Sequence, residues 1–509
     1  MDPVAAPPKE DAAPQVGAAV KRGYMWNLIN FAVSQGASLL IFIVLSRALA
    51  PTTFGVFALA ALVVDLVSEW GRWASTDAIV QRRDYSPRTL STAFFSLLGV
   101  CACLFAALAI SSGWAATLLN EPGIAKILPA LAITLLIMPA TAVMDALILR
   151  QLNFRGHAIR SMTGMIAGGT VGLAVAFSPA LEWALVAQRL TASTAILTAL
   201  FLFTRWRPTL EFGTSVARDF LGRALKLWAA SVLATMHWRV AHASIGLRSG
   251  AASLGLLTVA HRFETTLHGP LTGPIQSLWV PVLSALRRDK SECWQLFLRL
   301  TQLTSLLVVP AFVGLALVAH DLVAVVLDER YRVVGSILVV VGLQGFTISV
   351  GYFSNLIFAG LDRTDLSLKF SVAQLCIIIP AVWITALHGP VYTQIVILVM
   401  VGSSRFIATL VQVRMLGGRF LELVYALMPA YLSGLVMAGT VLTLKLAVPV
   451  DVGLWRLLFL AGAGAATYCA WILFFHRHEV IEAWRLISTL RSNNTKDSPS
   501  GAAAHGASE

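Results

Sequence analysis

The feature that most constrains this chain is a series of long apolar runs, joined by connections too short to fold by themselves. The run at residues 24–49 is followed by another at 54–80, with only Ala50-Pro51-Thr52-Thr53 between them. A helix that crosses a membrane needs about 20 mostly apolar residues, and inside lipid the backbone satisfies its polar groups only through its own helix. Runs of this length therefore predict membrane-spanning helices.

Runs of the same kind continue along the chain and predict about fourteen spanning helices. Charged residues make up 13% of the chain, about half of the fraction usual in soluble domains, which excludes a large soluble core. We therefore expect an all-α polytopic membrane protein. Its spanning segments are expected at 24–49, 54–80, 90–118, 124–148, 157–178, 182–204, 224–247, 251–283, 294–319, 333–359, 367–388, 390–413, 424–447 and 453–475.

The basic residues indicate how the chain is oriented. Connections rich in Lys and Arg, such as 205–223 and 285–293, alternate with connections that have none, such as 50–53 and 388–390. Because basic loops remain cytoplasmic, we expect a multi-pass membrane protein with both termini in the cytoplasm. The connection 320–332 is mixed and is the exception. The net charge of +12 thus points to a lipid bilayer as partner and not to nucleic acid.

A short motif at the first turn recurs further along the chain. "FGVFALA" at Phe54 has a counterpart in "LGLLTVA" at Leu254. This offset predicts two parallel six-helix halves, an architecture common among transporters, in which the substrate path lies between the halves. The alternative is that a short Gly/Ala pattern recurs by chance in apolar sequence. We expect Gly55 and Gly255 to lie in matching hairpins at the outer face, where they let the first two helices of each half approach closely.

These observations predict six regions. A disordered cytoplasmic tail, a first lobe with helices one to six and a cytoplasmic linker are followed by a second lobe with helices seven to twelve. Two further helices then lead to a cytoplasmic amphipathic helix and a second disordered tail. The respective boundaries are 1–23, 24–204, 205–223, 224–413, 424–475 and 476–509.

Three segments carry a family resemblance. Residues 44–60, "VLSRALAPTTFGVFALA", resemble the "R-x-L-x-P-x-x-F-G-x-x-A" signature of the polysaccharide transporter family. "DLVSEWGRWASTDAIVQRRD", which begins at Asp65, resembles the second helix of that family, and "ALILRQLNFRGHA" at 146–158 resembles its connection between helices four and five. The chain departs from the family at Glu69-Trp70-Gly71-Arg72, where relatives commonly read something like "D-L-G-L".

The resemblance implies both a fold and an activity. The family includes Wzx-type flippases and belongs to the multidrug/oligosaccharidyl-lipid/polysaccharide exporter superfamily. It implies two six-helix lobes around a central cavity, with two more helices at the C-terminus. It also implies movement of polyprenyl-diphosphate-linked glycans, specifically undecaprenyl-diphosphate-linked oligosaccharides, to the periplasmic leaflet of a bacterial inner membrane. The implied partners are a polysaccharide polymerase and co-polymerase.

Ionisable residues inside the spanning segments are the candidate functional residues. A charged side chain at mid-membrane costs about 2.5–3.5 kcal/mol on insertion scales, so such groups must face one another or a hydrated cavity. We expect Arg189 and Arg405 to extend only toward helix ends, as long basic side chains do. The full set is Asp65, Glu69, Arg72, Arg189, Arg239, Arg262, Glu264 and Arg405.

The seventh and eighth helices hold the candidate substrate site. Arg239, His242, His261 and Arg262 are expected to form a cationic patch for the diphosphate or for acidic sugars, because the guanidinium fork matches phosphate and carboxylate oxygens. The alternative is that Arg239 and Glu264 form a buried pair that fixes the packing of the two helices. Gly269-Pro270 and Gly273-Pro274 are expected to bend or interrupt the eighth helix.

Three acidic residues are candidates for ion coupling. Asp65 and Glu69 are the first two candidates and share one stripe of the second helix with Arg72. Because one Arg stands against two carboxylates, the surplus carboxylate could take up a proton during transport. The alternative is an internal salt bridge. Glu264 is the third candidate. The five cysteines lack ligand spacing, so we expect no metal, no cofactor and no catalytic residue.

Other functions compete with a flippase that works by alternating access. A cation-coupled small-molecule exporter of the same superfamily usually has a carboxylate in its first or seventh helix, and segments 25–45 and 224–247 contain none. Lipid II flippases have an Arg-rich first helix, which is absent here. A membrane enzyme of polysaccharide assembly needs a sizeable outward loop, and 320–332 is too short to fold alone. The flippase is therefore the leading hypothesis.

Overall fold

The computed structural model describes most of the chain as helices. The described residues are 34–69, 76–80, 86–151, 153–286, 289–351, 353–354, 357–358, 361, 363–447, 453–475 and 477. The tail 1–23, the amphipathic segment near 480–490 and Arg72 lie outside these residues, so their predicted roles stay predictions.

The all-α prediction is confirmed within the described residues. Twelve of the helices are long and apolar enough to span a membrane, and Ser34–Ala48 is a shorter apolar helix. The number fourteen stays a prediction. The main helices are α2 (Pro51–Glu69), α3 (Thr76–Val80), α4 (Pro87–Leu118), α5 (Ile124–Arg150), α6 (Phe154–Ala176), α7 (Ala184–Thr204), α8 (Thr214–Leu286), α9 (Lys290–Val326), α10 (Arg332–Gly351), α12 (Thr364–Thr385), α13 (Pro390–Leu416), α14 (Phe420–Ala447) and α15 (Leu454–Phe475).

Local sequence explains where several helices begin and end. The hydroxyl of Ser86 accepts a hydrogen bond from the backbone N–H of Thr89, and Pro87 follows at the first helical position of α4. The carboxylate of Asp289 accepts bonds from the first backbone N–H groups of α9. Both are preferred N-terminal caps. Gly417 adopts a left-handed conformation that ends α13, as glycine does without steric cost.

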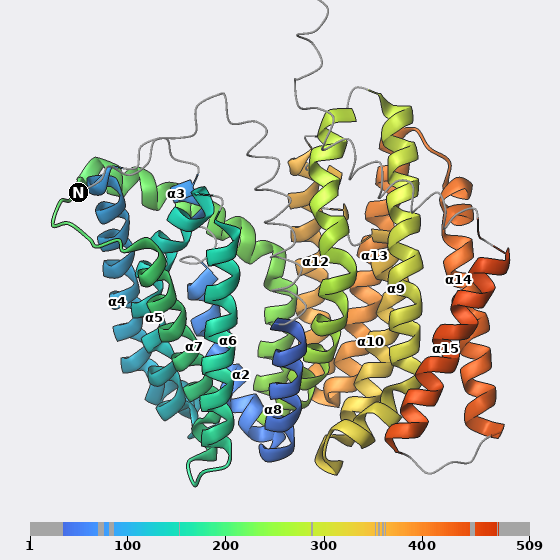
Figure 1. Ribbon diagram of the computed structural model, residues 1–509, viewed down its shortest axis with the longest axis horizontal. Helices are drawn as coiled ribbons and strands as arrows, with labels where there is room; N and C mark the ends of the chain where they lie inside the picture. Colours follow the sequence, from blue (N-terminus) through green and yellow to red (C-terminus); the bar gives the residue numbers. More distant parts are fainter. Residues whose placement is uncertain are drawn as a thin grey trace, which may run out of the picture.

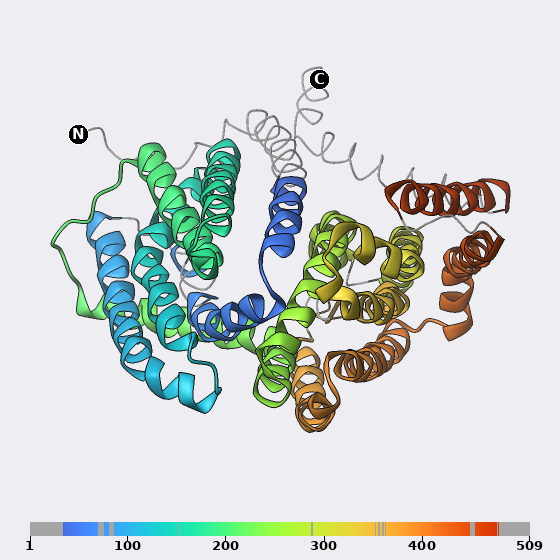
Figure 2. The same cartoon turned by 90° about the horizontal axis from the view of Figure 1, so that it is seen from below.

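The helices form two groups (Figure 1). Helices α4 to α7 make the group at the left, and α9, α10, α12 and α13 make the group at the right, with α14 and α15 at its outer edge. The turned view shows the same division, with the helix Ser34–Ala48 between the groups (Figure 2). Helix α8 runs from the first group to the second.

Helix α8 covers the two spans predicted at 224–247 and 251–283, which meet at the non-helical Gly250, and it differs from the prediction in two ways. It begins at Thr214, within the segment 205–223 that was expected to be only a linker. Phe220 in this part belongs to one buried cluster with Leu90 of α4. The non-helical backbone inside α8 lies at Gly250, with φ 83° and ψ 171°, and helical backbone continues through Gly269-Pro270 and Gly273-Pro274. The interruption expected at those prolines is therefore wrong.

The two groups meet where α2 lies against α8, and glycine permits this contact. A Cβ atom on Gly55 would lie 1.7 Å from the carbonyl oxygen of Ala251, and one on Gly255 would lie 1.8 Å from that of Pro51. Both glycines are thus on the same side of the molecule, as predicted. However, they bring the two halves together instead of the first two helices within each half, so that part of the prediction is wrong.

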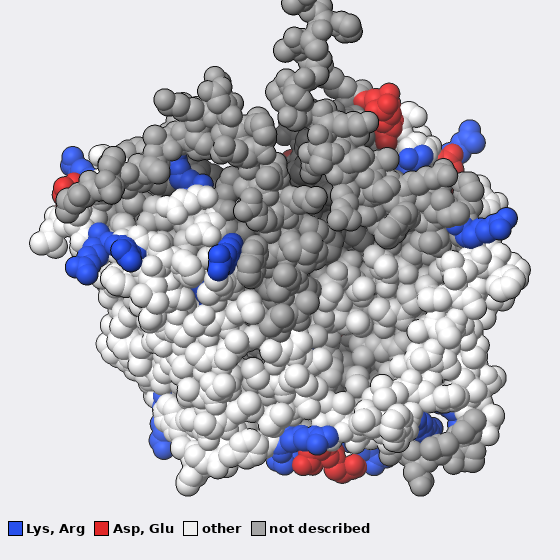
Figure 3. Space-filling model, viewed as in Figure 1, with Lys and Arg blue, Asp and Glu red and all other residues white. Residues whose placement is uncertain are grey.

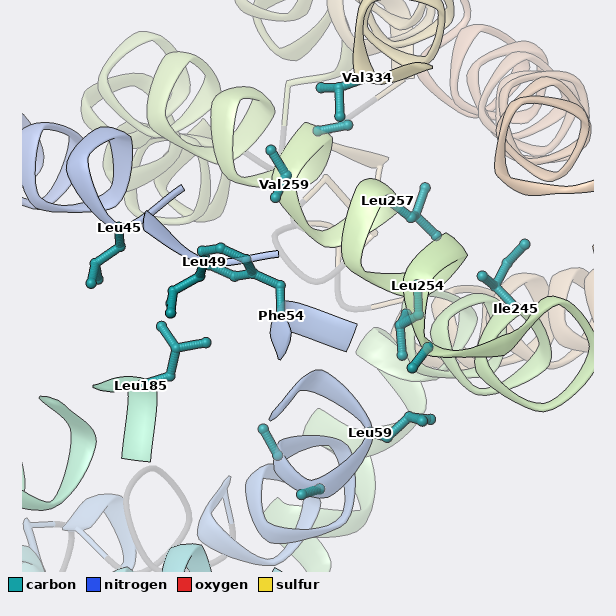
Figure 4. Packing of buried hydrophobic residues seen from close by; sticks show 14 of the residues in the cluster. Leu45, Leu49, Phe54, Leu59, Leu185, Ile245, Leu254, Leu257, Val259 and Val334 are labelled. Atoms are coloured by element: carbon teal, nitrogen blue, oxygen red, sulfur yellow. The ribbon is translucent and has the colours of Figure 1, made fainter. Parts of the chain in front are cut away.

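Buried apolar residues from both groups form one continuous core at this contact. Leu49 and Phe54 from the first half lie in the same cluster as Leu254 and Val259 of α8 and Val334 of α10 (Figure 4). Burial of this kind stabilises helix contacts mainly through close packing, because lipid is as apolar as the core. The core therefore joins the helix Ser34–Ala48 and α2 to α8 and α10.

Charged side chains mark the two ends of the molecule. On the face shown in Figure 3, Lys, Arg, Asp and Glu gather at the upper and lower edges and leave an uncharged band between them. At the turn between α9 and α10, Arg330 bonds Asp328 at 3.0 Å and Arg332 lies 3.5 Å from Glu329. The hydrogen bond from Arg330 holds the pKa of Asp328 below its usual value. The basic residues of this exceptional connection are thus neutralised locally.

Candidate functional site

The candidate substrate site centres on α8, and Arg262 connects it to the other half. A guanidinium N–H of Arg262 donates to the hydroxyl of Ser38, in the helix Ser34–Ala48. Arg262 is half-buried. Its cationic end therefore lies between the two groups of helices, where a substrate path between the halves would pass.

His242 and His261 form a hydrogen-bonded chain. Nε2 of His242 lies 3.0 Å from Nδ1 of His261, whose Nε2 lies 3.0 Å from the Oε1 atom of Gln394 in α13. Since Oε1 can only accept, Nε2 of His261 carries the hydrogen and its Nδ1 accepts from His242. Trp238 packs edge-on against His261, with ring centroids 4.7 Å apart. Because His261 is buried, these hydrogen bonds hold the His261 ring in a fixed orientation.

The four residues of the predicted cationic patch therefore do not all face the same side of α8. Arg239 lies beside His242 and adds its positive charge there, and its Nη1 lies 3.5 Å from the carbonyl oxygen of Leu62 in α2. His261 faces α13, whereas Arg262, the next residue, faces the first half. Adjacent helical residues point about 100° apart, which accounts for this division.

Glu264 is also buried, and Arg405 of α13 lies near enough for its charge to act on the carboxylate. Arg405 acts on His268 as well, and its Nη1 donates to the hydroxyl of Thr347 at 3.1 Å. Among the described residues, Glu264 forms no ion pair with Arg239, the alternative considered from the sequence. The expectation that Arg405 only reaches toward a helix end is wrong.

Asp65 forms an ion pair with Arg189 of α7. The expectation that Arg189 only reaches toward a helix end is therefore also wrong. Glu69 is the last residue of α2, while its side chain and Arg72 lie outside what the structure describes. Of the stripe predicted on the second helix, Asp65 is therefore neutralised by Arg189 of the neighbouring helix α7.

A buried charge cluster escaped the sequence analysis. Asp321 of α9 lies 2.5 Å from Nζ of Lys445 in α14 and 3.5 Å from Nε of Arg456 in α15. Asp321 was expected in an outward loop at 320–332, but α9 continues to Val326. The available signal was Lys445, a cation inside the predicted span 424–447. These contacts fasten the last two helices to the second group.

The chemistry of the site suits binding more than bond cleavage. Arg262 and Arg239 offer permanently charged forks for oxyanions, and the histidine chain holds hydrogen atoms at defined positions. A buried carboxylate beside one cation, as at Glu264, is able to exchange a proton when its surroundings change.

The chain is similar to known proteins over most of its length. Residues 44–336 match the family model described as "Polysaccharide biosynthesis protein". The chain is 23% identical to the lipopolysaccharide biosynthesis protein WzxC of Escherichia coli K12, over 81% of this chain and 85% of that protein. It is 22% identical to the succinoglycan biosynthesis transport protein ExoT of Rhizobium meliloti 1021, over 61% of this chain and 63% of that protein.

Solved structures share the fold. The lipid II flippase MurJ, in an inward closed conformation, superposes with a TM-score of 0.73 and 13% identity, over 90% of this chain and all of that one. A multidrug resistance transporter of the MATE family superposes with a TM-score of 0.60 and 14% identity, over 75% of this chain and 94% of that one. At these identities the likeness concerns the fold alone.

Proposed function

The chain belongs to the polysaccharide biosynthesis protein family, and from this premise we propose that it moves polyprenyl-diphosphate-linked oligosaccharides across the inner membrane. The family match over residues 44–336 is the observation that carries this proposal. The chain is a multi-pass membrane transporter and not an enzyme. The similarity to ExoT, a succinoglycan biosynthesis transport protein, supports the proposed transport function.

The proposed path runs between the two groups of helices. Both termini and the connection 205–223 lie in the cytoplasm, and the turn between α9 and α10 lies outside, according to the Lys and Arg distribution. The substrate enters from the cytoplasmic leaflet, and the halves 24–204 and 224–413 then exchange their open side by alternating access. The glycan thereby reaches the periplasmic leaflet for exopolysaccharide, capsule or O-antigen assembly.

Four residues of α8 are assigned to substrate binding. Arg262 and Arg239 contact the diphosphate or acidic sugars, because a guanidinium forms paired hydrogen bonds to such oxyanions. His242, beside Arg239, and His261, which is hydrogen-bonded to Gln394, contribute further polar contacts on the side of α13. The contact of Arg262 with Ser38 supports this assignment, since Ser38 belongs to the helix Ser34–Ala48 between the two groups of helices.

Three acids are assigned to ion coupling. Glu264 is the first candidate, because it is buried with Arg405 as its charged neighbour. Asp65 would take up a proton only when Arg189 moves away, and Glu69 is the remaining candidate. With Glu264→Gln, we expect transport to lose its response to a proton gradient while substrate binding persists. Transport by this variant that still follows the gradient would assign coupling elsewhere.

The glycan must also pass to the next step of assembly. We propose that a polysaccharide polymerase and co-polymerase receive it at the outer leaflet. Chemical cross-linking in native membranes, followed by mass spectrometry, tests this partnership. Recovery of the protein without either partner would contradict the proposed partnership and would not affect the proposed transport function.

The function is tested by removing the protein from its native cell. We expect surface glycan to disappear and lipid-linked oligosaccharide to accumulate on the cytoplasmic leaflet, with recovery on re-expression. Arg262→Lys keeps the charge but loses the fork, and should restore export much less well than the matched exposed control Arg223→Lys. Unchanged surface glycan in the deletion strain would contradict the proposal.

A further inference from the structure

The contact between the two halves has a polar part that the proposed substrate site does not use. Arg47, at the end of the helix Ser34–Ala48, donates from Nε to the carbonyl oxygen of Val326 at 2.9 Å and from Nη2 to that of Val325 at 2.7 Å. These carbonyls belong to the last turn of α9, which lies in the opposite half.

The end of a helix makes this contact favourable. The last four carbonyl groups of an α-helix have no partner within the helix, and they carry a partial negative charge. Arg47 supplies both the missing donors and a positive charge. Because its side chain is exposed, water screens part of this attraction, so Arg47 holds the halves together reversibly.

Two residues of the second half also bind backbone groups of the first half. The hydroxyl of Tyr331, which is fully buried, donates to the carbonyl oxygen of Leu49 at 2.9 Å. Arg330 lies 3.4 Å from the carbonyl oxygen of Arg47. The ring of Tyr331 also packs edge-on against Phe54, with centroids 6.4 Å apart. The short turn after residue 46 is thus bound by the other half along its length.

The sequence motif and the contact coincide. Arg47, Pro51 and Gly55 are three positions of the "R-x-L-x-P-x-x-F-G" segment, and each touches the second half: Arg47 at α9, and Pro51 and Gly55 at α8. We propose that this segment, with Tyr331 and Arg330, is a latch that closes the outer end of the transport path. The inference rests on the proposed function and its orientation.

The latch must open once in every transport cycle. A path between the halves reaches the outside only when α2 moves from α8 and the turn 47–50 leaves the end of α9. Most of the bonds involved have backbone carbonyls as acceptors, so water can replace the lost partners as the halves separate. Arg47 and Tyr331 are therefore positioning residues, whose loss favours the outward-open state.

Accessibility of the closed seam tests the latch without any substrate. Leu49→Cys places a thiol at a position with 0% exposure, in the full-length protein. A membrane-impermeant maleimide is applied to spheroplasts, and mass spectrometry of the peptide containing residue 49 measures its labelling rate. This rate is measured for Leu49→Cys alone and for Leu49→Cys combined with Arg47→Ala, Arg47→Lys or Tyr331→Phe. The matched control is Arg332→Ala, whose partner Glu329 lies in the same turn and half.

We expect Arg47→Ala and Tyr331→Phe to raise the labelling rate at residue 49 about tenfold, Arg47→Lys to raise it less, and Arg332→Ala to leave it unchanged. Equal rates in all correctly inserted variants would overturn the latch. If Arg47→Ala fails to insert, Arg47→Lys and Tyr331→Phe decide the matter, since they keep the charge and the ring. Faster labelling without any glycan export by the parent protein would contradict the proposed function and leave the latch intact.

Discussion

Asp321 of α9 lies 2.5 Å from the ammonium nitrogen of Lys445 in α14, and its side chain is only 7% exposed. Arg456 of α15 approaches the same carboxylate. Asp321 therefore links α9 to two helices that lie more than a hundred residues further along the chain. We infer that α14 and α15 move with the second group as one body.

Removal of this acid should destabilise the protein strongly. Asp321→Asn leaves two cations facing each other, and breaking a buried pair typically costs about 3–5 kcal/mol. The check is thermal unfolding of the purified protein, with Asp365→Asn as the control because its partner Arg363 and the acid itself are half exposed. Asp321→Asn/Lys445→Met should recover part of the loss. Equal stability of the two Asp→Asn variants would contradict the inference.

The glycine contact between α2 and α8 should not tolerate a methyl group. Gly55→Ala or Gly255→Ala would place a Cβ atom within 2 Å of a carbonyl oxygen of the opposite helix, so the helices must separate. Overpacking of this kind costs about 1–3 kcal/mol. Gly99→Ala in α4 is the control, because nothing lies within 4 Å of its added Cβ. Membrane abundance and thermal stability that match this control would show that the contact is looser than described.

The ion pair between Asp65 and Arg189 should be measurable as a coupling energy. The side chains are 44% and 24% exposed, so solvent reduces their attraction, and we expect a coupling of about 1 kcal/mol. A double-mutant cycle with Asp65→Asn and Arg189→Gln measures it. The comparison is the more exposed helical pair Asp219–Arg223, for which a few tenths of a kcal/mol is expected. Additive effects of Asp65→Asn and Arg189→Gln would refute the pairing.

The helices could be predicted from the sequence because hydropathy is a local property. Runs such as 390–413 and 424–447 correspond closely to α13 and α14. The repeated glycines at 55 and 255 were also visible, as a motif at a fixed offset. Their partner was not, because the motif alone does not say whether a helix packs within its own half or against the other one.

The charge partners could not be predicted for a related reason. Glu264 and Arg405 are 141 residues apart, and the distance between their charges depends on how α8 and α13 are rotated about their axes. A single sequence contains the spacing along each helix but not this rotation. The same reason explains why Arg189 and Arg405 were assigned to helix ends, and why the direction of Arg262 away from His261 became visible only in the structure.

The central claim is that the protein itself moves a lipid-linked glycan and that Arg262 binds it. The direct measurement uses proteoliposomes that contain undecaprenyl-diphosphate-linked oligosaccharide, with a glycosidase added outside to detect molecules that reach the outer leaflet. We predict movement by the wild type, none by empty liposomes, and an apparent affinity about ten- to a hundredfold weaker for Arg262→Lys. Equal rates in wild-type and empty liposomes would contradict the account.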